Sequence, residues 1–532
     1  GIRHVLMDRD ASFCASFQAI LESVGIEPVW SKKSDGTKLL ISARLAFALK
    51  GRVSTESVRR APSLRRSTGG VVQHLQLRVP VDRGGEGVAV VADGYWPALK
   101  GRDALVVKWD DGALGSLSSE GISKLLTEAT KKPGAVARNE GDVSVAVTTT
   151  VEAVYEAPYL AHACMEPMNC TAWVRANEAE VWAPTQGPGP HQGIVAQLTG
   201  LPPEKVQVHT TYLGGGFGRR FAPDFIIAAT LLAKAAGVPV KLVYTREDDM
   251  RAWFYRPASV TRFTAGLDAA GNPVSLTARV ASPALSIAAG FATELPKGID
   301  EAAVEGIADM LYGFPNLRVE YARTEPGVPP WYWRSVGHSQ NVYFIEAFID
   351  EIAAAAGKDP VEFRRSLLTK QPRLRGVLDL AAQRAGWGSP LPQGVHRGVA
   401  ITNCFGSFVA QVAEVSMDAS GKPRVHRIVA AVDCGRTVNP DVIHRQVEGA
   451  IVYGLSAALH GKITFRNGRV EQSNFDDYPM LRMEDMPRVE VHIVPSTEAP
   501  GGIGEPGLPP ATPAVVNAMF AATGKRVRTL PI

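Results

Sequence analysis

The sequence predicts a large protein of α+β or mixed α/β class, in which strands and helices alternate along the chain. Its 532 residues suffice for several domains of a typical size of about 150 residues. With 45% hydrophobic and 21% charged residues, the composition is globular and excludes a disordered chain. The third observation is the pattern after Val151, where strand-like alternation and helical spacing follow one another.

The chain before Val151 is expected to hold a small β-rich unit and a linker. Val88–Val91 is apolar enough for a strand, and Tyr95–Leu99 with Leu105–Trp109 are expected to continue the β-rich unit. Residues 110–150 are expected to be a linker with one helix near Ser119–Thr130.

The rest of the chain gives clearer signals. Lys205–Tyr212 alternates like a strand and runs into a glycine-rich segment, after which Asp224–Ala236 has helical spacing. Gln340–Ala356 is a long helix with its apolar residues on one face, and Pro360 can begin the next helix. The further predicted elements are a helix at Val361–Leu368, strands at Arg424–Val432 and Arg488–Val494, and a helix at Pro513–Ala522.

The basic charge is confined to the N-terminus. The net charge is +4, but residues 1–70 hold 12 Lys/Arg and 6 Asp/Glu, so the remaining residues are slightly acidic. Such an asymmetry is typical of a nucleic-acid-binding arm, or of a segment with a different origin from the rest.

The cysteines exclude two kinds of metal site. None of the five forms a CxxC pair, so neither a zinc ribbon nor an iron–sulfur cluster is expected. No apolar run reaches 18 residues, so no membrane span is expected, and no export signal is visible. The chain begins with Gly1, and its compartment, periplasm or cytoplasm of a bacterium, is left open.

Three motifs each allow two interpretations. The run Gly214–Gly218 can bring backbone N–H groups to a pyrophosphate or pterin, or it is a plain glycine-rich turn; it fits neither GxGxxG nor Walker A. Glu505 between glycines is a general base held in a rigid loop, or a solvated loop residue. Gln186 aims an amide at an oxo group, or is a polar loop residue.

Two further motifs have mainly structural interpretations. His162 and Cys164 near Glu166 suggest a metal site, but the spacing matches no zinc pattern and buried structural roles are favoured. Asp433-Cys-Gly435 with Asn439-Pro440 indicates a turn and a helix start.

Taken in order, the motifs are far more specific than any one alone. The series is His162-Ala-Cys-Met-Glu166-Pro-Met-Asn169, Ala183-Pro-Thr-Gln186, Gly214-Gly-Gly-Phe-Gly218, Trp333-Arg-Ser-Val-Gly337, Phe348-Ile-Asp-Glu351, Asp433-Cys-Gly435, Gln446-Val-Glu-Gly449 and Gly504-Glu-Pro-Gly507. It resembles the large, molybdopterin-binding subunit of the xanthine dehydrogenase and aldehyde oxidase superfamily. The sequences of Ser473–Pro479 and Glu490–Glu505 are most similar to the isoquinoline 1-oxidoreductase beta-subunit type. The resemblance covers about residues 87–532.

The resemblance implies a molybdenum hydroxylase. Such enzymes hydroxylate an N-heteroaromatic, isoquinoline-like ring or oxidise an aldehyde, with water as the oxygen source, while the cofactor carries the redox chemistry. It implies that Glu505 is the catalytic base that deprotonates the hydroxide on molybdenum, and that no protein side chain binds the metal directly. The cofactor-binding residues implied are Gln186, Gly214, Gly215, Gly216, Phe217, Gly218, Arg334, Gln446, Gly449 and Gly504, and the substrate pocket is lined by Arg334 and Phe405.

Cofactor form and partners follow from the same resemblance. It implies molybdopterin in its cytosine dinucleotide form, and a separate small subunit with [2Fe–2S] clusters that receives the electrons. A cytochrome-type electron acceptor and a small-molecule substrate complete the partners, and no nucleic acid is expected for residues 87–532. The implied domains are a truncated, hammerhead-like β-rich remnant with linker at 87–150 and molybdopterin-binding domains at 151–333 and 334–532.

The N-terminus departs from this resemblance. Ile2–Met7 is strand-like, Phe17–Val24 has helical spacing, and residues 1–30 resemble a fragment of a DDE-type integrase or transposase core in which Asp8 is one metal-binding aspartate. The other carboxylates of that triad have no matching context, so no transposase activity is expected. Residues 31–86 form an unassigned basic segment.

Three functions are therefore open at this stage. The first is an active molybdenum hydroxylase subunit. The second is a truncated, non-catalytic remnant of such a subunit fused to a transposase fragment. The third, a nucleic-acid-binding protein that uses the basic N-terminal arm, is the least favoured because the remainder of the chain is nearly neutral.

Overall fold

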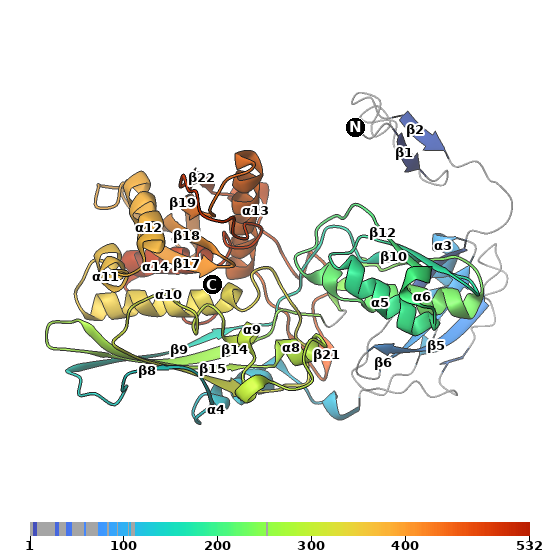
Figure 1. The fold of residues 1–532 in the computed structure, drawn as a ribbon, viewed down its shortest axis with the longest axis horizontal. Helices are drawn as coiled ribbons and strands as arrows, with labels where there is room; N and C mark the ends of the chain where they lie inside the picture. The colour runs from blue at the N-terminus through green and yellow to red at the C-terminus, as the bar shows by residue number, and fades with distance from the viewer. Residues whose placement is uncertain are drawn as a thin grey trace.

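Three large sheets organise the chain into two lobes (Figure 1). The computed structural model describes strands within the first 92 residues (4–7, 27–30, 39–44, 58–59, 73–81 and 85–92), and then residues 94–104, 106–107, 112–251 and 254–532. One lobe is built on a seven-stranded sheet. The other stacks a five-stranded and a four-stranded sheet on either side of a long helix (Figure 1).

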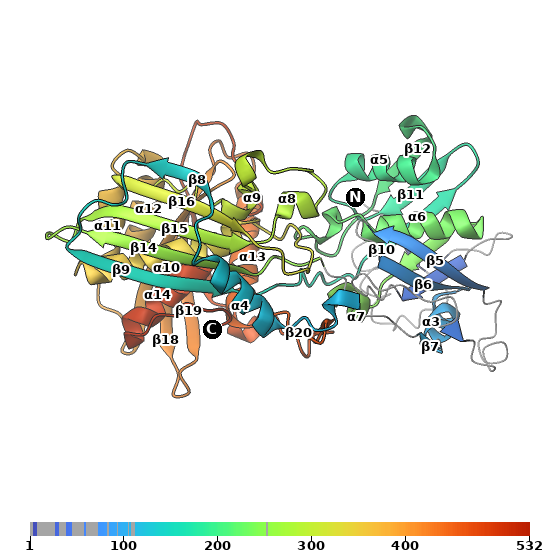
Figure 2. The same cartoon turned by 90° about the horizontal axis from the view of Figure 1, so that it is seen from below.

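The seven-stranded sheet has the order β12-β11-β10-β13-β3-β6-β5. Its strands are β3 (Leu39–Arg44), β5 (Gln73–Val81), β6 (Gly85–Ala92), β10 (Asn169–Val174), β11 (Ala179–Ala183), β12 (Val206–Thr210) and β13 (Val240–Val243). Helices α5 (Pro188–Thr199) and α6 (Asp224–Ala236) cover one face, and α3 (Tyr95–Asp103) lies on the other side (Figure 2). Most of α6 is apolar and buried, and it ends at Gly237 in the left-handed conformation.

The five-stranded sheet has the order β8-β16-β15-β14-β9 and forms the floor of the other lobe (Figure 2). Its strands are β8 (Ala135–Glu140), β9 (Thr149–Ala157), β14 (Ser259–Leu267), β15 (Pro273–Ser282) and β16 (Asn316–Arg323). Helix α10 (His338–Ala355) lies on this sheet, and it is buried along nearly its whole length because a second sheet packs above it.

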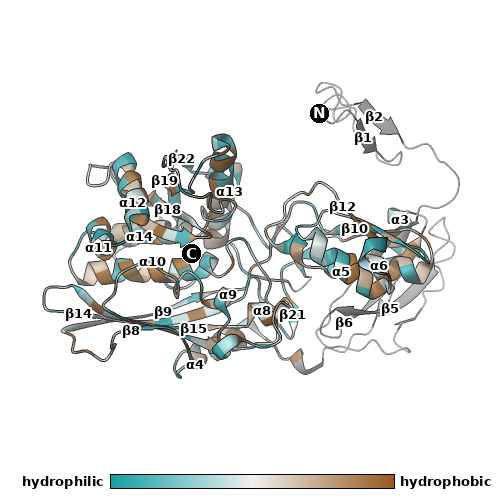
Figure 3. Ribbon diagram, viewed as in Figure 1, coloured by the Kyte–Doolittle hydropathy of each residue, from teal (hydrophilic) through white to brown (hydrophobic). Residues whose placement is uncertain are grey.

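That second sheet has the order β17-β18-β19-β22. Its strands are β17 (Val395–Cys404), β18 (Ser407–Met417), β19 (Pro423–Asp433) and β22 (Arg488–Ile493). The helices of this layer are α11 (Pro360–Leu367), α12 (Pro372–Ala385), α13 (Pro440–Leu459) and α14 (Ala511–Thr523). Apolar residues gather on the inner faces of the helices and sheets, as the hydropathy colouring shows (Figure 3).

Short elements complete the described chain. They are the strand pairs β1 (His4–Met7) with β2 (Glu27–Trp30), β4 (Val58–Arg59) with β7 (Val106–Val107), and β20 (Phe465–Arg466) with β21 (Arg469–Val470); the α-helices α4 (Ser119–Ala129), α7 (Arg246–Met250), α8 (Leu285–Ala288) and α9 (Glu301–Val304); and 3-10 turns at Gly112–Leu114, Pro203–Lys205, Arg219–Phe221, Pro296–Gly298 and Met483–Asp485. Among the described helices, none combines the length and the apolar character needed to cross a bilayer.

The long elements predicted from the sequence are confirmed. The structure has the expected strands within 2–7, 88–91, 205–212, 424–432 and 488–494, and the expected helices near 119–130, 224–236, 340–356, 361–368 and 513–522. Two expectations are wrong. Tyr95–Leu99 is helical, because Pro97 falls in a first turn whose N–H groups need no partner. The expected linker 110–150 contains a true sheet strand, β8, paired with β16.

The N-terminal expectations are only partly within the described residues. Asp8 and the helical spacing at Phe17–Val24 lie outside them. In the unassigned segment 31–86, β3 pairs with β13 and β5 pairs with β6, so this segment contributes to the seven-stranded sheet.

A buried ion pair connects α10 and α11 to β17 and to the segment before β16. Glu346 of α10 accepts hydrogen bonds from the Arg364 Nε at 2.9 Å, the Tyr312 hydroxyl at 2.6 Å and the Ile401 amide at 3.0 Å. Both charged side chains are almost completely buried. A buried carboxylate is tolerated only because these partners replace its water shell.

We predict that Arg364→Met destabilises the protein by about 3–5 kcal/mol, since Glu346 would keep a buried charge without its cation. Urea unfolding midpoints measure the effect. The matched control is Lys131→Met, which breaks an ion pair with Glu128 whose side chains are about half exposed (53% and 55%). That change should cost less than about 1 kcal/mol. Equal losses in the two variants would contradict the prediction.

Candidate functional site

The residues singled out from the sequence converge at the junction of the two lobes. Gln186 lies between β11 and α5, and Gly214–Gly218 lies between β12 and α6. Arg334 precedes α10, Gly504 and Glu505 precede α14, and Gln446 and Gly449 lie on α13. Hydrogen bonds connect these segments, which are up to 170 residues apart along the chain.

The glycine-rich loop is shaped by close approaches that only glycine permits. Gly218 has a φ of 99°, and a Cβ there would lie 2.1 Å from the carbonyl oxygen of Tyr332. A Cβ on Gly216 would lie 2.7 Å from Oε1 of Gln186. The glycines therefore let two other segments lie directly against the loop.

Gln186 is held in one amide orientation. Its Oε1 accepts hydrogen bonds from the backbone N–H groups of Gly218 at 3.1 Å and Arg220 at 3.3 Å. The side chain is exposed, and its Nε2 has no acceptor among the described residues. Because the carbonyl end is used by the loop, the NH₂ end is left as a donor for a ligand.

The loop also offers backbone donors. The N–H groups of Gly216 and Phe217 donate to no acceptor in the described part of the chain, whereas the next amide, of Gly218, is bonded to Gln186. Uncommitted amides at a tight glycine-rich turn ahead of a helix are a common anion-binding arrangement.

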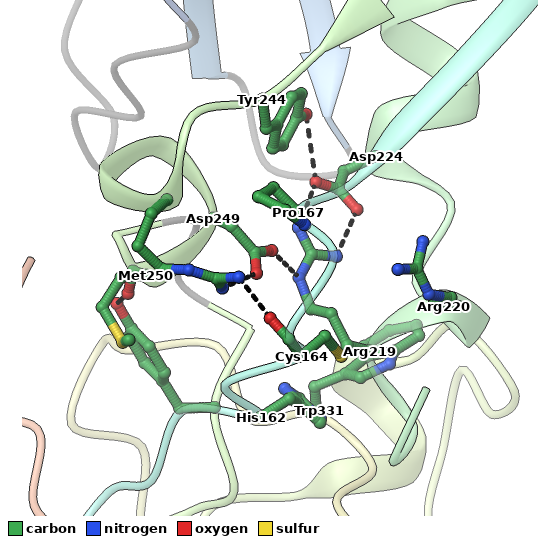
Figure 4. A network of polar contacts seen from close by, with 12 residues as sticks. His162, Cys164, Pro167, Arg219, Arg220, Asp224, Tyr244, Asp249, Met250 and Trp331 are labelled. Carbon is green, nitrogen blue, oxygen red and sulfur yellow. Dashed lines mark hydrogen bonds and ion pairs between the residues drawn. The ribbon is translucent and has the colours of Figure 1, made fainter. Parts of the chain in front are cut away.

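A buried charge network fixes the loop from below (Figure 4). Arg219 donates two hydrogen bonds to Asp224 at 2.7 and 2.8 Å and one to Asp249 at 3.0 Å. The Tyr244 hydroxyl donates to Asp224 at 3.2 Å, and the carboxylates raise the pKa of Arg219 despite its burial. A bidentate pair of this kind, removed from water, holds the loop in one position.

The segment containing His162 and Cys164 contacts the glycine-rich loop through hydrogen bonds. Burial lowers the pKa of His162 to about 3, so the ring is neutral, and its Nε2 lies 2.7 Å from the Tyr332 carbonyl oxygen. The Cys164 thiol donates to the Gly216 carbonyl at 3.4 Å. Arg220 donates to Glu166 Oε2 at 2.7 Å. These contacts give the segment a structural role beside the loop.

Arg334 joins three of the predicted segments. Its Nε donates to the Gly504 carbonyl at 2.8 Å, and one terminal nitrogen donates to Gln446 Oε1 at 3.2 Å. Its backbone N–H donates to the Phe217 carbonyl at 3.0 Å. Burial lowers the pKa of Arg334, although the group remains charged at neutral pH.

Glu505 is held by the residue that follows Arg334. The Ser335 amide donates to Glu505 Oε1 at 2.9 Å, and the Ser335 hydroxyl donates to the Glu505 carbonyl at 2.9 Å. Oε2 accepts no hydrogen bond from the described residues. The carboxylate is thus fixed at one oxygen and open at the other, as a positioned base requires.

Three aromatic rings stack beside these residues. Phe217 lies on Tyr453 with ring centroids 4.3 Å apart, and Tyr453 lies on Trp333 at 4.7 Å. Phe217 and Arg334 also line a pocket of about 420 Å³ with Gly449. The other lining residues are Arg445, Glu448, Val452, Tyr453, Ser456, Met480, Leu481 and Met486.

Phe405 lies at the turn between β17 and β18, where its ring is 40% exposed. Its carbonyl accepts a hydrogen bond from the Gly502 amide at 2.7 Å, which places the turn against the segment that leads to Glu505. At the other predicted turn, Asn439 caps α13 by accepting a hydrogen bond from the Val442 amide at 3.2 Å, as the sequence indicated.

The sequence analysis missed a charged cluster next to Phe405. The His338 ring lies 5.4 Å from that of Phe405, its Nε2 lies 3.2 Å from Asp309 Oδ2, and its Nδ1 lies 3.5 Å from Glu305 Oε1. Burial alone would lower the pKa of His338, but Asp309, Cys404 and Glu305 together raise it to about 12. The one sequence signal was a histidine directly after the Trp333–Gly337 motif.

We predict that Gly218→Ala destabilises the protein by more than about 2 kcal/mol, because alanine would be strained at this φ and would collide with the Tyr332 backbone. Thermal unfolding measures it. The control is Gly193→Ala on an exposed position of α5, where a Cβ meets nothing within 4 Å. This control should stabilise by about 0.5–1 kcal/mol; a destabilised control or a neutral Gly218→Ala would contradict the analysis.

His338 gives a prediction with a definite sign. Its pKa is higher in the folded state than the ordinary value of 6.5, so its stabilising effect is complete below about pH 6.5 and is lost as the pH rises toward 12. The stability difference between the wild type and His338→Asn should therefore shrink by about 1.4 kcal/mol per pH unit above neutrality. Urea titrations from pH 6 to pH 9 measure it, and a constant difference would be contrary to expectation.

Two family models match the chain. Both are described as a molybdopterin cofactor-binding domain, one over residues 128–368 and the other over 381–487. The first match contains the glycine-rich loop and Arg334, and the second contains Gln446 and Gly449.

Several characterised proteins are similar in sequence. The "membrane-bound aldehyde dehydrogenase [pyrroloquinoline-quinone]" of Gluconacetobacter polyoxogenes is 31% identical over 94% of this chain and 70% of its own length. The beta subunit of isoquinoline 1-oxidoreductase from Brevundimonas diminuta is 31% identical over 84% of this chain. A nicotinate dehydrogenase subunit from Pseudomonas putida is 28% identical over 84%. The chain spans only 59% and 40% of these last two proteins.

The alignment over 94% of the chain is longer than residues 87–532 alone, so the similarity extends into the first 86 residues. Solved structures share the fold. Quinoline 2-oxidoreductase from Pseudomonas putida 86 superposes with a TM-score of 0.75 over 98% of this chain and 96% of that chain, at 14% identity. CO dehydrogenase from Oligotropha carboxidovorans gives 0.76 over 97% and 95%, also at 14% identity.

The sequence similarity, the two matched cofactor-binding domains and the shared fold agree with the resemblance in the motifs. The chain belongs to the xanthine dehydrogenase/aldehyde oxidase family of molybdopterin-binding, molybdenum-dependent oxidoreductases.

Proposed function

We propose that this chain is the large subunit of a molybdenum hydroxylase that oxidises an N-heteroaromatic, isoquinoline-like ring or an aldehyde with water as the oxygen source. The observation that carries the proposal is the fixing of Glu505 by the Ser335 amide directly beside the Arg334 cluster. The names of two relatives, an isoquinoline 1-oxidoreductase and an aldehyde dehydrogenase, support the substrate classes.

The described residues fit a molybdopterin. The uncommitted amides of Gly216 and Phe217, and the Nε2 of Gln186, are donors suited to the oxygens and heteroatoms of such a cofactor. The pocket between the two lobes has room beside Gly449, where a Cβ would meet no atom closer than 4.0 Å. We propose that Gly449 and Gln446 hold the dinucleotide extension of the cofactor, and that this extension is cytosine dinucleotide.

When bound, the cofactor accepts two electrons from the substrate and supplies the oxygen that comes from water. The residues of the chain bind, orient and move a proton. Gln186 donates to an acceptor on the cofactor, and Arg334, which lines the pocket, holds the Gly504–Glu505 segment through the Gly504 carbonyl. Glu505 would accept, at its open Oε2, a proton released during the reaction.

The substrate is proposed to lie against Phe405, whose ring is presented at the β17–β18 turn. A flat aromatic substrate would gain stacking energy of about 0.5–1.5 kcal/mol there. By the family resemblance, the electrons then pass to a small subunit that carries [2Fe–2S] clusters, and from there to a cytochrome-type acceptor.

The test is turnover of the chain, co-produced with a small iron–sulfur subunit, on isoquinoline and on benzaldehyde with an artificial electron acceptor. Glu505→Gln should lower kcat by about a hundredfold or more while the molybdenum content stays at the wild-type level, because only the base is lost. The matched control is Glu498→Gln, an exposed carboxylate on the same segment.

An unchanged kcat in Glu505→Gln, or equal losses in Glu505→Gln and Glu498→Gln, would contradict the assignment of the base. A loaded wild type that oxidises neither substrate class would refute the proposed reaction and favour the non-catalytic remnant.

A further inference from the structure

The charged cluster around His338 lies outside the roles assigned so far. Asp309 and Glu305 come from the segment after α9, and His338 is the first residue of α10. The His338 side chain is 3% exposed, which makes it a buried histidine held between two carboxylates. A buried charge of this kind costs free energy, so its presence next to the proposed reaction site indicates a functional role.

The cluster is connected to Glu505 through one short turn. The Ser335 amide donates a hydrogen bond to Glu505, and the Gly337 amide donates one to Glu305 at 2.7 Å. His338 is the last residue of this turn. A Cβ on Gly337 would lie 2.3 Å from the Ala302 carbonyl oxygen, so the turn is pressed against the Glu305 segment. A movement of His338 relative to Asp309 or Glu305 would therefore move the Ser335 amide.

A second connection runs through β17. This strand ends at Cys404, directly before the turn that carries Phe405. Phe405, the next residue, contacts the His338 ring and bonds to Gly502, three residues before Glu505. Phe405 therefore connects the cluster to the segment that carries the base.

We propose that His338 is a positioning residue for the reaction: as an imidazolium between Asp309 and Glu305, it balances their negative charges and fixes the turn that presents the Ser335 amide to Glu505. This inference rests on the proposed function, because Glu505 is the base only if that reaction takes place.

The charges around both groups give the sign of the effect. His338 is faced by Asp309 and Glu305 from the segment after α9 and by Cys404 from β17. Glu505 accepts a hydrogen bond from the Ser335 amide, and the cation of Arg334 is bonded to the carbonyl of the preceding residue, Gly504. Removal of the imidazolium leaves two carboxylates without a cation and loosens the Ser335 hydrogen bond, and both changes favour the protonated form of Glu505.

The experiment measures kcat/KM against pH for the holoenzyme. In His338→Asn the acidic limb should move upward by at least about 0.5 pH unit. Asp309→Asn should not move the acidic limb upward. The double variant His338→Asn/Asp309→Asn should return the limb most of the way to its wild-type position, because one of the two carboxylates left without a cation has been removed. Glu301→Gln is the control, since it removes an exposed carboxylate four residues before Glu305 and should leave the limb unchanged.

If His338 had only a structural role, the opposite results would be expected. The double variant would then be worse than His338→Asn, and kcat would fall without a shift of the pH limb. Either result would overturn the proposal. An upward shift in Glu301→Gln as large as that in His338→Asn would also overturn it, because any nearby charge would then suffice.

A readout without turnover separates this inference from the proposed function. The ¹⁵N resonances of His338, assigned by their absence in His338→Asn, report its protonation in the holoenzyme. A His338 ring that is doubly protonated at pH 9, and that begins to titrate at lower pH in Asp309→Asn, supports an imidazolium held between Asp309 and Glu305. This holds even if no substrate is oxidised and the proposed function fails. A neutral ring at pH 8 refutes the inference whatever the activity.

Discussion

The turn from Arg334 to His338 is the constraint on which the candidate site depends. It links the glycine-rich loop to the segment of Glu505, because Arg334 bonds both Phe217 and Gly504. Ser335 and Val336 adopt φ values of 73° and 48°, which cost roughly 1–2 kcal/mol each for residues other than glycine. The turn keeps this conformation because bonds to Glu505 and Glu305, from Ser335 and Gly337, hold it at successive points.

Buried charge serves as the scaffold on both sides of this turn. Next to the glycine-rich loop, Arg219 forms ion pairs with both Asp224 and Asp249. In the other lobe, Arg364 of α11 is paired with Glu346 of α10. Each ion is removed from water and is stable only in contact with its partner, so a displaced loop would leave an unpaired charge. Such pairs fix geometry more than they add stability, which suits a site assembled from segments that are far apart in sequence.

The sequence predicted the long elements better than their arrangement. The helical spacing of apolar residues in α6 and α10 is a local signal, whereas the motifs from His162 to Glu505 pointed to the family only as a series. The hydrogen bond of Ser335 to Glu505 spans 170 residues and leaves no local pattern. His338 carries no signature of its charge, because its two carboxylate partners come from another segment. Helix α3 was mistaken for strand because its local composition is ambiguous and Pro97 lies in its first turn.

The central claim is that the Gln186, Gly214–Gly218, Arg334 and Gly449 surfaces form one working site for a molybdopterin. The most direct measurement is the molybdenum content of the purified chain after co-production with a small iron–sulfur subunit in a host that makes the cofactor. The account predicts stoichiometric metal. A chain without molybdenum, when a longer relative prepared in the same way is fully loaded, would contradict it.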